Sequence, residues 1–149
     1  MQKQYSIIVN APIETVFAIL SEKQHLDKHY EGKSEIKITT ANDFSDPVGT
    51  KFHQKIAGLL ELDGEIIAYT YPLELGIGIE VNGLKGTIFY NLKNVAPDQT
   101  NLMFNLEFFD GTKAKKILLS TLQPLYNKII GDYLASIKKL AEQETVASA

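Results

Sequence analysis

The sequence contains no cysteine and no tryptophan. Because there is no thiol, disulfide bonds, thiolate metal sites and a cysteine nucleophile are all excluded. Long apolar runs are missing as well: no stretch of 18 apolar residues could form a transmembrane helix, and the first residues lack the apolar core of a signal peptide. We therefore expect a protein of the cytoplasm that has no transmembrane segment.

An excess of charge of one sign is also missing. The net charge is −3, so the 149-residue chain as a whole has no general attraction for nucleic acid or anionic lipid. We expect no nucleic-acid partner, and membrane contact only of a transient kind. A hydrophobic share of 44% and a charged share of 22% are typical of a globular domain. The length predicts one domain over residues 1–149, with residues 143–149 as a frayed tail.

Two short helices are expected after the first strand. Residues 5–9 alternate between polar and apolar, and Asn10 and Pro12 follow as a helix cap and a first-turn proline. Apolar residues then recur with helical spacing at positions 13, 16, 17 and 20. The second short helix or turn is expected from residue 21 to about residue 30, before Gly32.

Most of the remaining chain alternates between apolar and polar residues, as strands do. Asn82-Gly83 is a strong hairpin signal between two such segments, and Pro97-Asp98 marks another turn. Residues 65–71 also favour a strand, but their pattern does not show which side chains point inward. Short connections predict an antiparallel meander. The predicted strands are residues 5–9, 33–40, 51–56, 65–71, 74–81, 84–93 and 102–108.

A long helix is expected from residue 112 to about residue 142, roughly 45 Å at 1.5 Å per residue. Its wide apolar stripe is typical of a helix that lies on a sheet. Pro124 predicts a kink between residues 120 and 124, because proline removes one backbone donor and crowds the preceding turn. The fold class predicted is α+β: a curved antiparallel sheet of about seven strands around the C-terminal helix, with the two short helices after strand 1.

A curved sheet around one helix leaves two interpretations open. The inward side chains either form a packed core or surround a cavity. Gln54 and Tyr90 are the polar members of the inward set, and Tyr126 and Tyr133 face them from the helix. A few polar groups in an apolar pocket are typical of a small-molecule site. The apolar members of the inward set are Ile36, Ile38, Phe52, Leu75, Ile77, Ile79, Ile88, Leu102, Phe104 and Leu106.

Four segments, in this order, resemble one superfamily, the START-like or Bet v 1-like helix-grip proteins, and within it the polyketide cyclase/dehydrase and lipid-transport group. Residues 7–17, I-I-V-N-A-P-I-E-T-V-F, are similar to the family's first strand and helix entry. Residues 48–52, V-G-T-K-F, resemble its third strand. Residues 83–90, G-L-K-G-T-I-F-Y, resemble its sixth strand, and L-Q-P-L at 122–125 lies in its long helix. The resemblance spans roughly residues 4–140.

The resemblance implies the helix-grip fold but several activities. Members of the superfamily carry lipids, quinones, sterols or plant hormones; others cyclise or dehydrate polyketides, and others act as co-chaperones. Where many relatives have tryptophan after the second helix, this chain has His29 and Tyr30. That departure alters the expected mouth of the cavity and puts the transfer of any particular ligand in doubt.

Few residues offer catalytic chemistry. His25 and His29 have helical i, i+4 spacing, but zinc would need a third ligand and the sequence has no HExxH motif. His53 shares the outer phase of its strand with two lysines. No G-x-S-x-G motif is present either, so no nucleophile is indicated. We therefore predict no catalytic residue, no metal site and no cofactor.

Three functions remain open, in this order: a carrier or sensor of a hydrophobic small molecule, such as a lipid, isoprenoid or polyketide-like compound; a cyclase/aromatase-type enzyme that uses the same cavity; and a co-chaperone-like interaction module. We expect a monomer or weak dimer. The predicted mouth of the cavity consists of Leu26, His29, Tyr30 and Pro124. The predicted ligand-binding residues are Ile38, Phe52, Gln54, Ile77, Ile79, Ile88, Tyr90, Leu102, Phe104, Leu118, Leu122, Tyr126, Ile129 and Tyr133.

Overall fold

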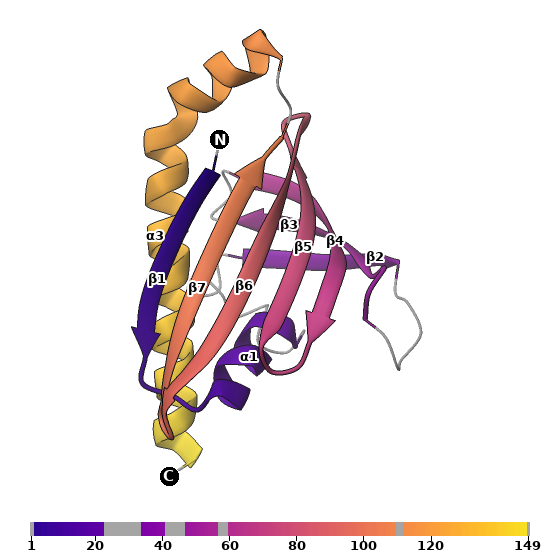
Figure 1. Cartoon of the computed structure of the whole chain (residues 1–149). Coiled ribbons are helices and arrows are strands. Elements are labelled where there is room, and N and C mark those ends of the chain that lie inside the picture. The colour runs from indigo at the N-terminus through magenta and orange to yellow at the C-terminus, as the bar shows by residue number, and fades with distance from the viewer. Residues whose placement is uncertain (1, 23–33, 41–46, 57–59, 110–111, 149) are drawn as a thin grey trace.

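The computed structural model describes residues 2–22, 34–40, 47–56, 60–109 and 112–148. Seven strands and two helices occupy these ranges, and α3 is much the longest element (Figure 1). In chain order the elements are β1 (Gln2–Val9), α1 (Ile13–Ser21), β2 (Ser34–Thr40), β3 (Lys51–Ile56), β4 (Leu60–Thr70), β5 (Glu74–Val81), β6 (Leu84–Ala96), β7 (Gln99–Phe108) and α3 (Lys113–Ser148).

The strands form one antiparallel sheet in the order β1-β7-β6-β5-β4-β3-β2. From β2 to β7 each strand pairs with the next in sequence, and β1 closes the other edge beside β7. Figure 1 shows β2 and β3 running across the direction of β5, β6 and β7, so the sheet curls strongly. The bulge between Ile66 and Ala68 in β4 contributes to this curl, because bulges increase local twist. The predicted α+β helix-grip architecture is confirmed.

The predicted hairpin turn at Asn82-Gly83 is confirmed. Both residues have positive φ, 53° at Asn82 and 79° at Gly83. A two-residue turn of this kind matches the right-handed twist of the flanking strands, and asparagine and glycine tolerate the required backbone conformation best. The turn aligns β5 with β6 so that Ile77 lies opposite Ile88 and Leu75 opposite Tyr90.

The predicted capping of α1 by Asn10 is wrong. The helix begins at Ile13, and Pro12 occupies the cap position without a side-chain hydrogen bond. Asn10 therefore precedes the cap by two residues, and it makes tertiary contacts instead. Its side-chain oxygen accepts a hydrogen bond from Gln99 at 3.1 Å, and its backbone N–H donates to Glu142 at 3.3 Å. The second short helix predicted after α1 falls mostly on residues 23–33, which lie outside the described residues.

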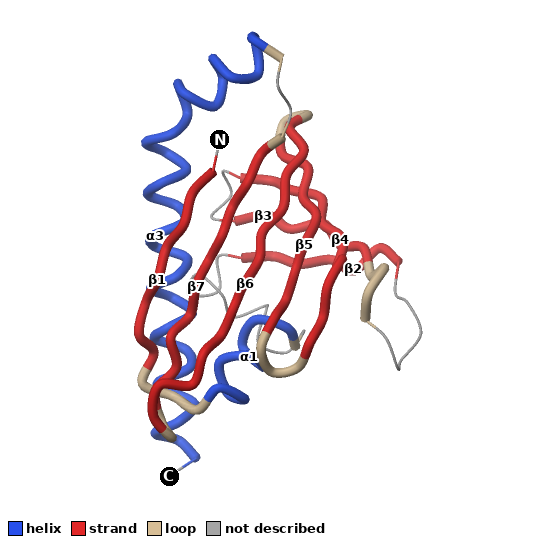
Figure 2. The backbone as a smooth tube through the Cα atoms, in the orientation of Figure 1, coloured by secondary structure: helices blue, strands red, loops and turns tan. Residues whose placement is uncertain are grey.

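Helices α1 and α3 cover the sheet, and Figure 2 shows α3 along one side and α1 at one end. Five residues of α1 are buried, with Val16 and Phe17 fully so. The Phe17 ring packs edge-on against Tyr69 and Tyr71 at the β4–β5 turn. Among the described residues, no helix is both long and apolar enough to cross a membrane.

Helix α3 is longer than the sequence pattern indicates. It continues to Ser148, whereas residues 143–149 were expected to form a frayed tail. Pro124 lies inside the helix, and Figure 1 shows the first turns of α3 inclined to the remainder, as the proline pattern predicts. Side chains of α3 also bind the edge strand: Lys138 donates to the carbonyl of Ile8 at 2.8 Å, and Tyr5 donates to Asn127 at 3.1 Å.

Candidate functional site

A cavity of about 330 Å³ lies between the curved sheet and α3. Its wall takes residues from strands β2 to β7, from the end of α1 and from the middle of α3. The side chains of the described residues thus leave this interior space open. The lining residues are Leu20, Ser21, Ile36, Ile38, Pro47, Thr50, Phe52, Gln54, Ile56, Leu60, Leu62, Ile66, Leu75, Ile77, Ile79, Val81, Ile88, Tyr90, Phe104, Leu106, Phe108, Tyr126, Ile129, Ile130 and Tyr133.

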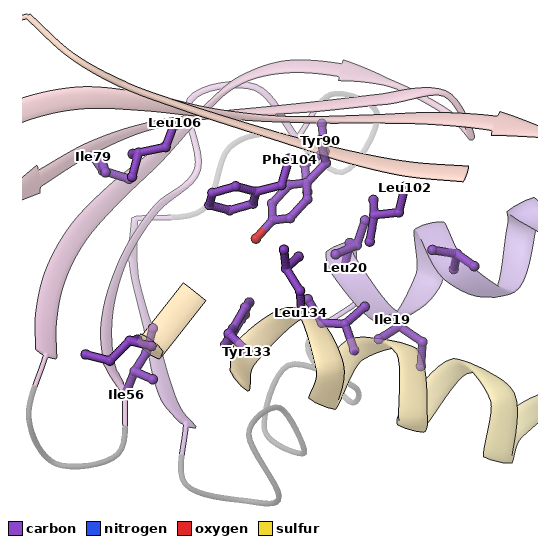
Figure 3. Close-up of a cluster of buried hydrophobic side chains, with 14 of the residues drawn as sticks. Ile19, Leu20, Ile56, Ile79, Tyr90, Leu102, Phe104, Leu106, Tyr133 and Leu134 are labelled. Carbon is purple, nitrogen blue, oxygen red and sulfur yellow. The ribbon is translucent and has the colours of Figure 1, made fainter. Parts of the chain in front are cut away.

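Most of the predicted ligand-binding residues lie on this wall. They come from six elements that are distant in sequence, and the alternation of each strand turns them to the same side. Figure 3 shows Tyr90 and Phe104 side by side on the inner face, above α3. The residues that the structure brings together are Ile38, Phe52, Gln54, Ile77, Ile79, Ile88, Tyr90, Phe104, Tyr126, Ile129 and Tyr133.

Leu102, Leu118 and Leu122 do not line the cavity. Leu102 is only 1% exposed and belongs to the solid core; Figure 3 shows it beside Leu20, because α1 fills that end of the sheet. Leu118 is 37% exposed, whereas its neighbour Leu119 is buried, and Leu122 packs at the margin of the core. The apolar periodicity that suggested these three residues did not predict whether they reach the cavity wall.

The predicted mouth cannot be placed as a whole. Leu26, His29 and Tyr30 lie outside the described residues, as does His25. Pro124 is described, and it is exposed on α3 and does not line the cavity. The mouth of the cavity formed by these residues stays a prediction.

Strand β4 supplies wall residues that the sequence interpretation missed. Leu60, Leu62 and Ile66 line the cavity, and β4 begins five residues earlier than predicted. A usable signal was present, since Leu60 and Leu62 alternate with Glu61 and Asp63. The remaining missed wall residues are Leu20, Ser21, Pro47, Thr50, Ile56, Val81, Phe108 and Ile130.

One polar group in the wall joins the sheet to the helix. The buried side-chain amide of Gln54 donates a hydrogen bond to the Tyr133 hydroxyl at 3.4 Å. Burial raises the pKa of Tyr133 to about 12, although the hydrogen bond from Gln54 opposes this rise. Burial, followed by the nearby Tyr133, raises the pKa of Tyr90 well above its ordinary value of 10. Both phenols are therefore protonated, neutral hydrogen-bond donors at physiological pH.

The second polar group is the Tyr126 hydroxyl. Its oxygen is buried and has no hydrogen-bond partner among the described residues, while its ring packs against Phe108 at 6.5 Å between centroids. An unpaired buried hydroxyl costs about 1–3 kcal/mol, so native structures rarely retain one without a reason. Tyr126 and Tyr133 are seven residues apart on α3, roughly 10 Å along the axis at 1.5 Å per residue. The wall therefore presents hydroxyl groups at two separate positions.

Charged groups lie on the opposite face of the sheet. His53 pairs with Asp63 at 2.9 Å and with Glu61 at 3.8 Å, and Lys51 pairs with Glu65 at 3.7 Å, all on the outer face. No Asp, Glu, Lys, Arg or His belongs to the described part of the wall. In the same described ranges, no three His, Asp or Glu side chains gather into a possible metal site.

Glycine residues shape the wall where strands must approach side chains closely. Gly64 lies directly opposite Phe52 in the β3–β4 ladder, and the Phe52 ring occupies the space that a Cβ of Gly64 would need. The ring can therefore lie flat against β4 at the edge of the cavity.

Tyr90 and Tyr5 pack edge-on against Phe104, at 5.4 and 6.0 Å between centroids, which orients the Phe104 ring in the same wall.

Comparison with known proteins identifies the fold. No family model and no curated protein matches the sequence. Solved structures do match: the Zhui aromatase/cyclase from Streptomyces sp. R1128 superposes with a TM-score of 0.74 at 12% identity, covering 96% of this chain and 94% of that one. A START superfamily protein from Mycobacterium smegmatis matches with a TM-score of 0.67 at 13% identity, covering 99% of both chains.

A third similar structure is an HSP90 activator from Plasmodium falciparum, with a TM-score of 0.67 at 16% identity, covering 94% of this chain and 95% of that one. Identities this low establish the fold alone, because one fold supports many activities. The chain has the START-like helix-grip fold that its sequence motifs resemble.

Proposed function

We propose that this protein binds a neutral, hydrophobic small molecule in the cavity between the sheet and α3, as a carrier or sensor. The observation that carries the proposal is the cavity itself, an apolar space of about 330 Å³ with a few hydroxyl and amide groups in its wall. Binding sites for small molecules typically measure about 300–1,000 Å³ and have this composition. One or two ordered waters would need far less room.

The wall favours a ligand without net charge. An ion buried there would have no counter-ion among the described wall residues, and an uncompensated buried charge costs several kcal/mol. A lipid, an isoprenoid or a polyketide-like molecule would suit the aliphatic and aromatic side chains. A free carboxylate or amine would have to remain at the surface.

The hydroxyl groups favour a ligand that carries oxygen acceptors, such as carbonyl groups. The Tyr126 hydroxyl lacks a partner in the part of the chain that the structure describes, and Figure 3 shows the Tyr90 hydroxyl pointing from β6 toward α3. Phenols with raised pKa values donate hydrogen bonds without ionising. A carbonyl oxygen near Tyr126 would satisfy its hydroxyl and remove the cost of leaving it unpaired.

Filling the cavity tests the proposal directly. Ile88→Trp should occupy the space and abolish retention of copurifying hydrophobic molecules, as measured by native mass spectrometry and organic extraction. Lys93→Trp is the matched control, because Lys93 lies on the same strand with its side chain exposed on the other face. Wild-type protein and Lys93→Trp should retain equal amounts. Equal retention by Ile88→Trp would contradict the proposal.

Tyr126→Phe separates a ligand contact from a structural one. Removing an unpaired hydroxyl should leave the free energy of unfolding of ligand-free protein unchanged, or raise it by about 1 kcal/mol. The same variant should bind an oxygen-bearing ligand roughly tenfold less tightly, for the loss of about 1.4 kcal/mol from one hydrogen bond. Urea denaturation and ligand titration measure the two effects. Loss of stability without loss of affinity would assign the hydroxyl to the fold instead.

A cyclase/aromatase-type enzyme is the second candidate. The similarity to the Zhui aromatase/cyclase and the Gln54–Tyr133–Tyr90 group in the wall favour it. Catalysis would come largely from holding a poly-ketone chain folded and polarising one carbonyl group. Tyr90→Phe and Gln54→Leu should then abolish turnover of an aromatisable polyketide without unfolding the protein. Retained turnover would remove those two residues from the mechanism.

A protein-interaction module is the third candidate, supported by the similarity to an HSP90 activator. It predicts binding that does not depend on the cavity, so Ile88→Trp should leave partner binding intact. Pull-down with purified HSP90, comparing wild type with Ile88→Trp, distinguishes it from the first two candidates. For all three candidate functions we expect the protein to be a monomer or weak dimer, which sedimentation would measure.

A further inference from the structure

The beginning of α3 carries charges of the sign that a helix N-terminus disfavours. Its first turn has no acidic residue and holds Lys113, Lys115 and Lys116. A helix N-terminus has a partial positive charge and is stabilised by carboxylates, so lysines there reduce stability. The Lys115 side chain donates to the carbonyl of Gly83 at 3.1 Å, whereas the side-chain amines of Lys113 and Lys116 make no hydrogen bond or ion pair with the described residues. Residues 112–128 include four lysines and no acidic residue.

Large apolar side chains are exposed in the same region. Ile117 is 59% exposed and Leu125 is 43% exposed, one before and one after Pro124 on α3. Leu118 is exposed beside them. Phe109, at the end of β7, is 59% exposed. In the view of Figure 1 the first turns of α3 extend beyond the end of the sheet.

The exposed side chains adjoin one end of the cavity. Tyr126 follows Leu125 on α3, and Phe108 precedes Phe109 on β7; both line the cavity, and their rings pack together. At both places, therefore, an exposed apolar residue is adjacent in sequence to a residue that lines the cavity. A hydrophobic molecule that moved between the cavity and this surface would need to pass only the layer of side chains formed by Phe108 and Tyr126.

We propose that this basic apolar surface, formed by Phe109, Lys113, Lys116, Ile117, Leu118 and Leu125, docks on membranes that contain anionic lipid. Interfacial helices combine apolar side chains that enter the acyl boundary with lysines that contact anionic headgroups. The net charge of −3 gives the molecule as a whole no attraction for anionic lipid, so any attraction has to come from a local group of lysines such as this one. The charge complementarity favours a lipid surface over a neutral protein groove.

Vesicle sedimentation at low ionic strength tests the proposal. Wild-type protein should bind vesicles of equal parts phosphatidylglycerol and phosphatidylcholine, and bind pure phosphatidylcholine much more weakly. Lys113→Gln/Lys116→Gln should reduce the partition coefficient by roughly fivefold for each lysine. Lys37→Gln/Lys93→Gln is the matched control, because it removes two exposed lysines from the sheet and should bind as wild type does. Absent binding to the anionic vesicles, or an equal loss in the control, would overturn the proposal.

A tryptophan reporter identifies the surface that meets the lipid. The chain has no tryptophan, so Ile117→Trp provides a single emitter. Its emission should shift to shorter wavelength with anionic vesicles and be quenched by brominated lipid, whereas Ile67→Trp on β4 should change little. Vesicle binding without a shift at position 117 would overturn the assignment. So would a shift that appears without lipid as protein concentration rises, because a second protein copy would then cover these side chains.

Discussion

Single glycines on the inner face decide how closely neighbouring strands can approach. Gly86 faces the sheet interior between β5 and β7, and a Cβ there would overlap the carbonyl oxygen of Glu107 and crowd the Phe108 ring. A backbone atom in a paired strand cannot move aside cheaply. Gly131 differs, because it is exposed on α3 and a Cβ there would meet nothing within 4 Å.

Gly86→Ala and Gly131→Ala should therefore act in opposite directions. We expect Gly86→Ala to lower the free energy of unfolding by about 1–3 kcal/mol through overpacking. Gly131→Ala should raise it by up to about 1 kcal/mol, because alanine favours the helix. Urea denaturation of both variants provides the measurement. Equal effects at the two positions would contradict the close approach of β6 and β7 at Gly86.

His53 lies beside two carboxylates, Asp63 and Glu61, on the outer face of the sheet. Its hydrogen bond with Asp63, opposed by some desolvation and supported by the charges of Asp63 and Glu61, raises the pKa of His53 above 6.5. Because the folded-state pKa is raised, the stabilisation is complete at pH below 6.5 and is lost as the pH rises through the folded pKa. The side chain is largely at the surface, so the effect on stability is small.

An NMR titration of the imidazole signals checks this. The pKa of His53 should lie above 6.5 in the wild type and fall toward 6.5 in Asp63→Asn, which removes the carboxylate that contributes most to the raised pKa. His53→Gln identifies which signal belongs to this residue. A titration that Asp63→Asn leaves unchanged would show that the Asp63 contact does not control the pKa.

At the scale of an element, α3 has two parts. From Tyr126 onward the helix lies on the sheet, with Ile129, Tyr133 and Ile137 buried. Before Pro124 the helix is covered on one side only: Leu119 is buried, whereas Ile117 and Leu118 are exposed. Proline at this position leaves one backbone carbonyl without its helical donor, which weakens the helix at the junction between the two parts.

Pro124→Ala should strengthen this junction. Alanine restores the missing backbone donor, so we expect a straighter helix, a higher free energy of unfolding and slower exchange of bound ligand. Stopped-flow displacement of a fluorescent hydrophobic probe measures the exchange rate. Gln123→Ala is the control, because it changes the adjacent helical position without altering backbone donors. Unchanged exchange in Pro124→Ala would remove the proline from any gating role.

At the scale of the whole molecule, the unfilled interior couples stability to ligand. Side chains around an empty apolar cavity lose dispersion contacts, and an occupant would restore them. Ligand present at 100 times its Kd stabilises a protein by about 2.7 kcal/mol. If the cavity binds a ligand as proposed, the protein's stability should depend on whether that ligand is present.

Removing bound hydrophobic molecules should lower the melting temperature. Organic extraction or hydrophobic chromatography should decrease Tm by about 5–10 °C, given about 2–4 °C for each kcal/mol in a domain of this size. Ile88→Trp should show no such change, because its cavity is already filled. Differential scanning calorimetry of both proteins before and after extraction makes the comparison. Equal shifts in the two proteins would indicate that the extracted molecules bind elsewhere.

Local patterns in the sequence were enough to predict the architecture. Alternation in β5, β6 and β7, the Asn82-Gly83 turn and the long apolar stripe before and after Pro124 each depend on near neighbours in the chain. Because side chains alternate with a period of two along a strand, the inward residues Ile77, Ile88 and Phe104 could be predicted without coordinates.

Only the tertiary structure decided which inward residues face open space. Leu102 has the same phase as Phe104, yet α1 packs over it, and Asn10 binds Gln99 and Glu142 instead of capping α1. The wall residues Leu60 and Leu62 of β4 reach the cavity because the sheet curls. Whether facing side chains meet or leave a gap depends on sheet curvature and on where helices from distant parts of the chain are placed. Neither is set by residues adjacent in sequence.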